Sequence, residues 1–196
     1  MVVTDDETVF HRMWSHRDHG KDFRPSQAND STPGFRWLVT SFGTNWRLTE
    51  PQSAIGRLQL KKLPRWTAMR RANAAALDEA LLPLGAVSIL VPPNHLSHAY
   101  YKYCGLLDLA ALKSDWSHDR VCAELNAKGV PARVGACPDV SREAAFGDDA
   151  GAQPAHPVAE SLADRTFMLP VHPTLSASNM TFIAETVRAV ILAATR

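Results

Sequence analysis

Residues 42–60 read FGTNWRLTEPQSAIGRLQL and join a polar loop to the start of a long helix. Thr49 and Gln52 have the spacing of a capping box, in which each side chain can bond the backbone N–H of the other residue. Pro51 is tolerated in the first turn of a helix, where its missing N–H would have no intrahelical partner. We therefore expect the helix start to hold the preceding loop rigidly.

Two polar residues of that loop, Asn45 and Arg47, suit the recognition of an oxyanion. The asparagine offers an amide donor, and the arginine offers a planar cation with several N–H groups. The alternative interpretation is structural, with an asparagine that closes a turn and an arginine that lies on the surface. The residues alone leave both interpretations open.

The helix that begins after Thr49 is predicted to run to about Leu82, which makes a rod of about 50 Å at the rise of an α-helix. Pro64 should bend this helix without ending it, because proline lacks an N–H and clashes with the preceding turn. One face of the helix is basic and could bind nucleic acid. We expect a solvated face instead, because no aromatic residues alternate with these charges as stacking platforms. The apolar face is predicted to comprise Ala54, Ile55, Leu58, Leu63, Trp66, Met69, Leu77 and Leu81.

Beyond Leu84 and Gly85 the pattern changes to short alternating elements, which places a domain boundary there. Such alternation indicates a compact two-layer α/β domain. Residues 135–155 are rich in Gly, Pro, Asp and Ala and are predicted to form a mobile flap. Strands are predicted over residues 87–91, 99–107, 130–134 and 166–169, and helices over residues 117–128, 157–163 and 178–194. Tyr101, Tyr103 and Leu107 are expected on one strand face, and the helices are expected to bury Val121, Cys122, Leu125, Phe182, Ile183, Val187, Val190 and Ile191.

The chain begins with a short apolar run, residues 1–3, which is predicted to be a strand. A strand this short needs a sheet whose other members lie elsewhere, because an isolated strand leaves its backbone groups unpaired. Thr4 and Glu7 have capping-box spacing for a helix that ends near Gly20. Residues 21–40 are predicted to be a long ordered connection anchored by Phe35, Trp37, Leu38 and Val39.

The composition describes a globular chain of one or two domains, with 196 residues of which 45% are hydrophobic and 21% charged. Lys and Arg number 21 against 20 Asp and Glu, so the net charge of +1 creates no field that would attract nucleic acid or anionic lipid. No stretch approaches the roughly 18 consecutive apolar residues of a membrane span, and no basic leader precedes an apolar run. Neither membrane spanning nor secretion is expected.

Three cysteines, Cys104, Cys122 and Cys137, are widely spaced and form no C-x-x-C pair. This spacing argues against a disulfide framework and a zinc site and fits a reducing, cytoplasmic compartment. His16 and His19 have H-x-x-H spacing, but no acidic or thiol ligand is placed to complete a tetrahedral set. We expect no metal site, and we assign these histidines to the end of a helix, where their charge complements the dipole.

The order of several motifs along the chain is similar to that of a known enzyme family. The motifs are MVVTDDE, DHGKD, GTNWRLTEPQSAIGRLQL, HAYYKY, AKGVPARVGACP and HPVAESLADRTFMLPVHPTL, followed by an amphipathic helix. In this order they resemble the C-terminal half of the DegT/DnrJ/StrS-type sugar aminotransferases, which are fold-type-I enzymes dependent on pyridoxal phosphate. The resemblance covers essentially the whole chain, and N-W-R-L-T-E-x-Q-x-A-I-G is its most specific part.

The resemblance implies an α/β fold, namely the C-terminal portion of a pyridoxal phosphate (PLP)-dependent transferase, in which a long kinked helix leads into a small two-layer α/β domain. Residues 1–48 would be a remnant of the large cofactor-binding domain plus the active-site loop. Residues 49–84 would be the long kinked connecting helix. Residues 85–196 would be the small C-terminal α/β domain.

For the site, the resemblance implies that Asn45 reaches the phosphate of the PLP held by a neighbouring subunit. It also implies that Arg47 lies at the shared active site and binds substrate. His172, in the stretch L-P-V-H-P, follows a strand end that the family turns toward the cleft and is the second substrate-binding candidate. A buried histidine satisfied by backbone groups is the alternative for His172. The implied substrate is a keto nucleotide-sugar, with an amino acid such as glutamate as donor.

The family's Schiff-base lysine belongs to a Ser-x-x-Lys stretch that precedes the segment seen here as residues 1–4. Without such a lysine the chain offers no catalytic residue, and transamination is not expected from this chain alone. The lysines of the chain do not match that stretch: Lys21, Lys61, Lys62, Lys102, Lys113 and Lys128.

Two hypotheses of function follow. In the first, the chain is part of an enzyme that aminates a keto nucleotide-sugar for polysaccharide or secondary-metabolite biosynthesis, and its partner is a second copy or the N-terminal half of the same enzyme. In the second, the chain is a non-catalytic truncated relative that acts as a dimerisation or interaction module.

Overall fold

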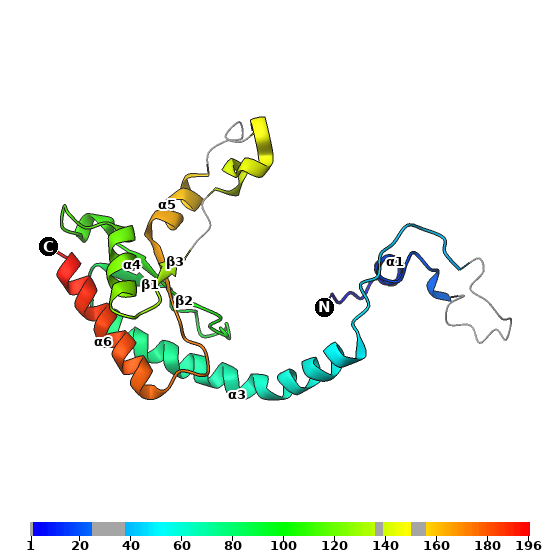
Figure 1. Ribbon diagram of the computed structural model, residues 1–196, viewed down its shortest axis with the longest axis horizontal. Coiled ribbons are helices and arrows are strands. Elements are labelled where there is room, and N and C mark those ends of the chain that lie inside the picture. The colour runs from blue at the N-terminus through cyan, green and yellow to red at the C-terminus, as the bar shows by residue number, and fades with distance from the viewer. Residues whose placement is uncertain (1, 25–37, 136–138, 150–155) are drawn as a thin grey trace. The chain divides into compact units, whose positions relative to one another are not determined.

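The computed structural model describes residues 2–24, 38–135, 139–149 and 156–196. The chain forms two compact units, Met1–Lys61 and Lys62–Arg196, and the boundary between them falls inside a long helix (Figure 1). Among the described residues, every buried hydrophobic side chain belongs to the second unit. No helix in these described ranges is long and apolar enough to cross a membrane.

The first unit contains helix α1, Glu7–Arg17, which begins after Asp6. The Asp6 side chain accepts the Val9 N–H at 3.0 Å and so caps the helix. The predicted cap at Thr4 is wrong, because the Thr4 hydroxyl accepts the Asp6 N–H instead. A helix at the predicted place is confirmed, and its capping residue lies two positions later in the sequence than predicted.

Two other predictions for this unit concern segments near the edge of the described chain. Residues 2 and 3 pair with no described strand, and residue 1 lies outside the described residues. The strand predicted over residues 1–3 stays a prediction, because the other members of its sheet were expected to lie elsewhere. The connection predicted over residues 21–40 is described only at its two ends. Its expected anchors Phe35 and Trp37 lie outside the described residues.

Helix α3, Glu50–Leu81, has 32 residues and confirms the predicted long helix. Its start is the predicted capping box, because the Thr49 N–H donates to Gln52 Oε1 at 3.1 Å and the Gln52 N–H donates to Thr49 Oγ1 at 3.5 Å. Pro64 lies inside α3, and the helix continues on both sides of it. A proline can therefore remove one backbone hydrogen bond here without ending the helix.

The apolar face predicted for α3 is buried only toward the C-terminal end of the helix. Leu77 and Leu81 are fully buried, whereas Ile55 and Leu58 are each 58% exposed. Helical periodicity correctly predicts which side of the helix is apolar. It does not predict which stretch of that side has other residues to pack against.

The second unit contains a four-stranded antiparallel sheet in the order β1-β2-β4-β3. Its strands are β1 Val87–Ile89, β2 Tyr103–Leu107, β3 Arg133–Val134 and β4 Thr166–Leu169. In the central pair, Gly105 of β2 lies opposite Phe167 of β4. A Cβ atom at this glycine would lie 2.5 Å from the phenylalanine ring, so any larger residue would have to displace that ring.

All four predicted strands exist, but β1, β2 and β3 are shorter than predicted. Carbonyl groups of Tyr100 and Tyr101, just before β2, accept hydrogen bonds from Arg70 of α3. The carbonyl of Ala132, just before β3, accepts one from the Asn126 side chain. Side chains therefore satisfy the backbone groups that a longer ladder would have paired.

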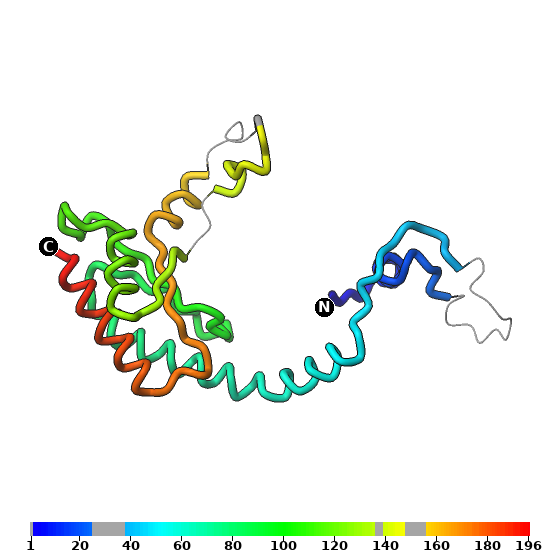
Figure 2. Tube along the Cα trace, in the orientation of Figure 1, coloured from blue at the N-terminus to red at the C-terminus, as the bar shows by residue number. Residues whose placement is uncertain are grey.

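Three helices complete the second unit, and α4 packs against α6 (Figure 2). All three confirm the predicted helices to within a few residues. The helices are α4 His118–Ala127, α5 Pro157–Arg165 and α6 Ala177–Ala194, and the short 3-10 helices are η1 Leu109–Ala111, η2 Val140–Arg142 and η3 Ala144–Asp149. The last two lie in the predicted flap, whose mobility stays a prediction and whose residues 136–138 and 150–155 lie outside the described chain.

One hydrophobic core joins the C-terminal part of α3, the sheet, α4 and α6. Two expectations for this region are wrong. Phe182 is 49% exposed on the outer side of α6, and Tyr101 is 78% exposed because it precedes the strand. The remaining expected residues are buried: Tyr103, Leu107, Val121, Cys122, Leu125, Ile183, Val187, Val190 and Ile191.

Candidate functional site

The loop that carries Asn45 and Arg47 is hydrogen-bonded to the C-terminal end of α1. The His19 N–H donates to the Thr44 carbonyl at 3.0 Å, and the Thr44 N–H donates to the His16 carbonyl at 2.7 Å. The Trp46 N–H donates to the Arg17 carbonyl at 3.0 Å. The loop is therefore held on one side by the α3 cap, as predicted, and on the other by the end of α1, which the sequence did not indicate.

A tight turn makes this arrangement possible. Gly20 follows α1 with a φ of +77°, in the left-handed region that glycine adopts without strain. A Cβ atom there would lie 1.7 Å from the Ser41 carbonyl oxygen, so the loop backbone can approach the turn only if this residue is glycine. Beyond the turn, Lys21 and Val39 form an antiparallel bridge, and the Asp22 N–H donates to the Leu38 carbonyl.

Asn45 and Arg47 lie together on this loop, as predicted. The Oδ1 atom of Asn45 accepts the Arg47 Nε–H at 3.2 Å and the Arg47 backbone N–H at 3.4 Å. The Nδ2 group of Asn45 and both terminal nitrogens of Arg47 have no hydrogen-bond partner among the described residues. The pair therefore presents an amide donor and a half-exposed guanidinium edge that remain available to a ligand.

A third residue, Asp18, forms an ion pair with the Nε side of the Arg47 guanidinium. Asp18 is only 6% exposed, and its Oδ1 lies 3.5 Å from Arg47 Nε and 3.4 Å from Lys21 Nζ. This oxygen accepts no hydrogen bond from the described residues. Two cations around one carboxylate leave one positive charge in excess, which favours an anion in front of Arg47.

These donors fit the phosphate of PLP, because a phosphate group is recognised by an amide N–H and by a planar guanidinium edge. The anion-binding interpretation of Asn45 and Arg47 stays a prediction that this geometry permits. Asn45 also closes a turn, because its Oδ1 accepts the two Arg47 hydrogen bonds. The structural role therefore uses the oxygen of the amide, and the anion-binding role would use its nitrogen.

His172 belongs to the second unit, whereas Asn45 and Arg47 belong to the first. Its ring is exposed, and its Nδ1 lies 2.7 Å from Thr174 Oγ1. Its carbonyl oxygen accepts the Nδ2–H of Asn73 from α3 at 3.2 Å, which holds the backbone after β4 against the helix. The alternative of a buried, backbone-satisfied histidine is wrong, and Nε2 is available to a ligand.

The histidines near α1 make aromatic contacts. The His16 ring meets the Trp46 ring edge-on with centroids 5.3 Å apart, and Trp46 remains 71% exposed. The His11 ring stacks on Phe23 with centroids 5.0 Å apart. In the part of the chain that the structure describes, no three His, Cys, Asp or Glu side chains come together as metal ligands would.

Asp18 is the functional residue that sequence reasoning missed, although it belongs to the quoted motif DHGKD. The sequence did contain a signal for the role of Asp18, namely its place at the C-terminal end of a predicted helix. An acidic residue at the C-cap of a helix opposes the helix dipole and therefore needs a compensating cation. The nearest arginine of the candidate site is 29 positions away in sequence, so only the folded loop brings the two charges together.

The long helix and the small antiparallel sheet have the fold of the C-terminal portion of a sugar aminotransferase. Residues 1–188 match the DegT/DnrJ/EryC1/StrS aminotransferase family, and the chain belongs to this family. The resemblance drawn from the motifs and the implied fold are both confirmed. This family is PLP-dependent.

Three relatives show how far the similarity extends. A solved aminotransferase from Psychrobacter cryohalolentis is 38% identical, has a TM-score of 0.88, and matches 98% of this chain but 51% of its own. The dTDP-3-amino-3,4,6-trideoxy-alpha-D-glucose transaminase of Streptomyces venezuelae is 25% identical over 95% of this chain and 44% of its own length. The L-glutamine:2-deoxy-scyllo-inosose aminotransferase of Micromonospora echinospora is 30% identical over 55% of this chain and 26% of its own. The chain spans about half or less of the length of these relatives.

Proposed function

We propose that this chain is the C-terminal part of a PLP-dependent aminotransferase that transfers an amino group to a keto nucleotide-sugar. The observation that carries the proposal is the Asp18-supported pair of Asn45 and Arg47, whose unpartnered donors face outward on a loop fixed at both ends. Family membership and the nucleotide-sugar named for the Streptomyces relative support the substrate class.

The residues of the chain take positioning roles in this proposal. Asn45 Nδ2 donates to the cofactor phosphate of a neighbouring subunit, and the terminal nitrogens of Arg47 bind an anionic group at the shared site. Asp18 orients the guanidinium, and His172 contacts substrate through its free ring nitrogen. PLP, when bound, supplies the electron sink and carries the amino group between donor and acceptor.

The Schiff-base lysine is proposed to come from sequence outside these 196 residues. The lysines here have other surroundings: Lys21 pairs with Asp18, Lys113 donates to the Ala193 carbonyl at 2.7 Å, and Lys62 and Lys102 lie over aromatic rings. Lys61 and Lys128 are exposed on helix surfaces. The half-length match to the relatives supports this assignment.

The proposed partner is the N-terminal half of the same enzyme, with a second copy completing a homodimer in the cytoplasm. Apolar side chains of the first unit are exposed, which supports the proposal that another polypeptide covers them. The second candidate function, a non-catalytic relative that acts as a dimerisation or interaction module, is favoured by the absence of a matching lysine. It predicts association without cofactor binding.

A cofactor titration separates these functions. The chain is mixed with PLP in the presence and absence of the N-terminal half, and bound cofactor is measured by its visible absorbance. We expect binding in the mixture and none to this chain alone. Binding to neither preparation, despite association of the two halves, would favour the non-catalytic module.

The same titration tests Asn45. We expect Asn45→Ala to weaken cofactor affinity of the assembled protein about tenfold, because it removes one hydrogen bond to a charged group. Gln59→Ala, an exposed amide on α3 without a described hydrogen bond, is the matched control and should leave affinity unchanged. Equal affinities for Asn45→Ala and the unaltered chain would remove the proposed phosphate contact.

A further inference from the structure

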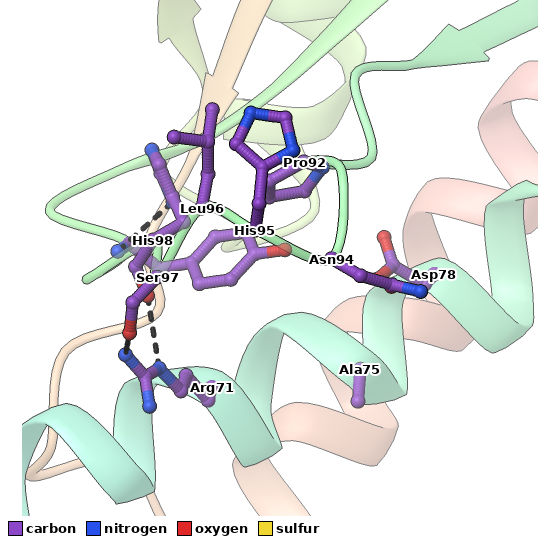
Figure 3. A pocket seen from close by; sticks show the side chains of 10 residues that line it. Arg71, Ala75, Asp78, Pro92, Asn94, His95, Leu96, Ser97 and His98 are labelled. Carbon is purple, nitrogen blue, oxygen red and sulfur yellow. Dashed lines mark hydrogen bonds between the residues drawn. The ribbon is translucent and has the colours of Figure 1, made fainter.

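The second unit contains a hollow of about 400 Å³ between α3 and the loop that joins β1 to β2 (Figure 3). Arg71, Ala75 and Asp78 of α3 form one wall, and the loop from Pro92 to Tyr100 forms the other. Every lining residue belongs to the second unit. A volume of this size suits one small ligand or one sugar ring.

The loop wall of this hollow is held to α3 by two arginines. Arg70 Nη1 donates to the carbonyl oxygens of Tyr100 and Tyr101 at 3.1 and 3.0 Å. Arg71 Nε donates to the His98 carbonyl at 2.9 Å, and its Nη2 donates to the Ser97 hydroxyl. The guanidinium groups are thus used to shape the wall, so the hollow exists before any ligand enters.

The backbone of this wall has an unusual conformation. Tyr100 has a φ of +47°, in the left-handed region that a bulky residue rarely adopts. Its N–H donates to His98 Nδ1 at 3.1 Å, and the two rings meet edge-on with centroids 4.4 Å apart. A strained residue held by surrounding contacts is typical of a functional site.

Several polar side chains of the hollow keep free hydrogen-bonding groups, among them those of Asp78, Asn94 and His95. Asp78 accepts the Tyr103 hydroxyl on Oδ1 at 2.7 Å, and its Oδ2 accepts nothing from the described residues. Asn94 and His95 make no hydrogen bond to any residue that the structure describes, and both line the hollow (Figure 3). The site therefore offers a carboxylate acceptor, an amide that both donates and accepts, and an imidazole.

This combination points to the chemistry of the ligand. Hydroxyl groups both donate and accept, so a polyhydroxyl ring can satisfy a carboxylate, an amide and an imidazole together. Ala75, Pro92 and Leu96 add apolar surface for the carbon atoms of the ring. An anion is disfavoured, because the Asp78 carboxylate repels it and the Arg71 guanidinium is already bonded to the loop.

We propose that this hollow is a carbohydrate-binding site, which takes a neutral polyhydroxyl ring such as a pyranose or a ribose. The site goes beyond the proposed function, because none of its residues belongs to the cofactor loop. A failure of the chain to bind PLP would leave this proposal unaffected.

The test is saturation-transfer NMR on the full chain with methyl glucopyranoside, ribose and inorganic phosphate as separate probes. We expect saturation transfer to at least one sugar and none to phosphate. Asn94→Ala and His95→Ala should each weaken sugar affinity about fivefold, which corresponds to the loss of one neutral hydrogen bond. Tyr101→Ala changes an exposed neighbour that does not line the hollow and should leave affinity unchanged.

Three outcomes would overturn the proposal. The first is phosphate binding without sugar binding, which would make the hollow an anion site. The second is sugar binding that neither Asn94→Ala nor His95→Ala weakens, which would place the sugar elsewhere. The third is no transfer to any probe while the amide spectrum shows an intact second unit.

Discussion

Asp18 determines how Arg47 presents its donors. A guanidinium held by its Nε keeps both terminal nitrogens on the opposite edge, which is the edge that pairs with a planar or tetrahedral anion. In the first unit this orientation comes from the buried Asp18 carboxylate and the Asn45 Oδ1 together. Lys21, 3.4 Å from the same carboxylate, reduces the charge that would otherwise repel an incoming phosphate.

Removing the charge of Asp18 should loosen the loop. We expect Asp18→Asn to speed hydrogen exchange of the Thr44 and Trp46 amides about fivefold, because a partly exposed ion pair contributes about 1 kcal/mol to local closure. The measurement is residue-resolved amide exchange by NMR. Asp5→Asn, at an exposed position without a described partner, is the control. Unchanged protection in Asp18→Asn would show that backbone bonds alone hold the loop.

Residue chemistry predicted Asn45 and Arg47 because their donors and the nearby α3 cap are visible in one short stretch of sequence. Asp18 could not be assigned in the same way, because its role depends on burial. The carboxylate matters only after Gly20 turns the chain and the loop returns beside α1. The contact between Asp18 and Arg47 is therefore a tertiary contact, which the sequence does not show.

The Asp139 carboxylate connects η2 to the start of α5. Asp139 accepts the N–H and hydroxyl of Ser141 at 3.0 and 2.7 Å, and its Oδ2 lies 3.0 Å from His156 Nδ1, just before α5. Arg142 of η2 pairs with Glu160 of α5 at 2.8 Å. The hydrogen bonds from Ser141 and then those from His156 hold the pKa of Asp139 well below its usual range.

This connection between η2 and α5 should weaken in acid. Because the pKa of Asp139 is lower in the folded than in the unfolded chain, its stabilisation is complete above the unfolded pKa of about 4 and is lost as the pH falls toward the folded pKa. We expect protection of the Ser141 and His156 amides to decline below about pH 4. Amide exchange followed by NMR across this pH range measures the effect.

Two comparisons make that prediction specific. Asp139→Asn should remove the pH dependence, because an amide does not titrate. The Asn179 amide, which donates to the neutral Ser176 hydroxyl in the α6 capping box, should show no matching change. A decline of equal size at Asn179 would indicate global acid unfolding instead of a local effect at Asp139.

At the scale of elements, sequence patterns predicted the existence of each described strand and α-helix of the second unit better than their ends, and they did not predict the 3-10 helices. β2 begins at Tyr103 because Arg70 bonds the preceding carbonyls, and β3 begins at Arg133 because Asn126 does the same. Both donors lie outside the strands concerned. A pattern read along one strand contains no information about them.

The molecule as a whole has its hydrophobic core in one unit. Among the described residues of the first unit, only Asp18 and Gly20 are buried, and Phe42, Trp46 and Leu48 are exposed. Exposed apolar side chains gathered in one region are typical of surfaces that contact another polypeptide. This is the physical basis for the proposed partner.

A charged residue among the exposed apolar side chains of α3 in the first unit should weaken assembly. We expect Leu58→Lys to reduce association with the N-terminal half or with a second copy at least about tenfold, because burying one leucine contributes about 1.5 kcal/mol or more. Sedimentation measures the association. Leu192→Lys, on the exposed side of α6, is the matched control. Equal association of both variants and the unaltered chain would exclude the first unit as the contact surface.

The sequence by itself determined the family, the capped start and length of α3, and the presence of the described strands and α-helices of the second unit. These features depend on side chains within a few turns of one another, so a linear pattern records them. Only the tertiary structure decided that Asp18 lies beside Arg47, that Ile55 and Leu58 are left exposed, and that two arginines of α3 hold the β1–β2 loop at the edge of a hollow. Each of these depends on residues that are distant in the chain, or on what does or does not pack against them, and burial cannot be read from a residue's neighbours in sequence.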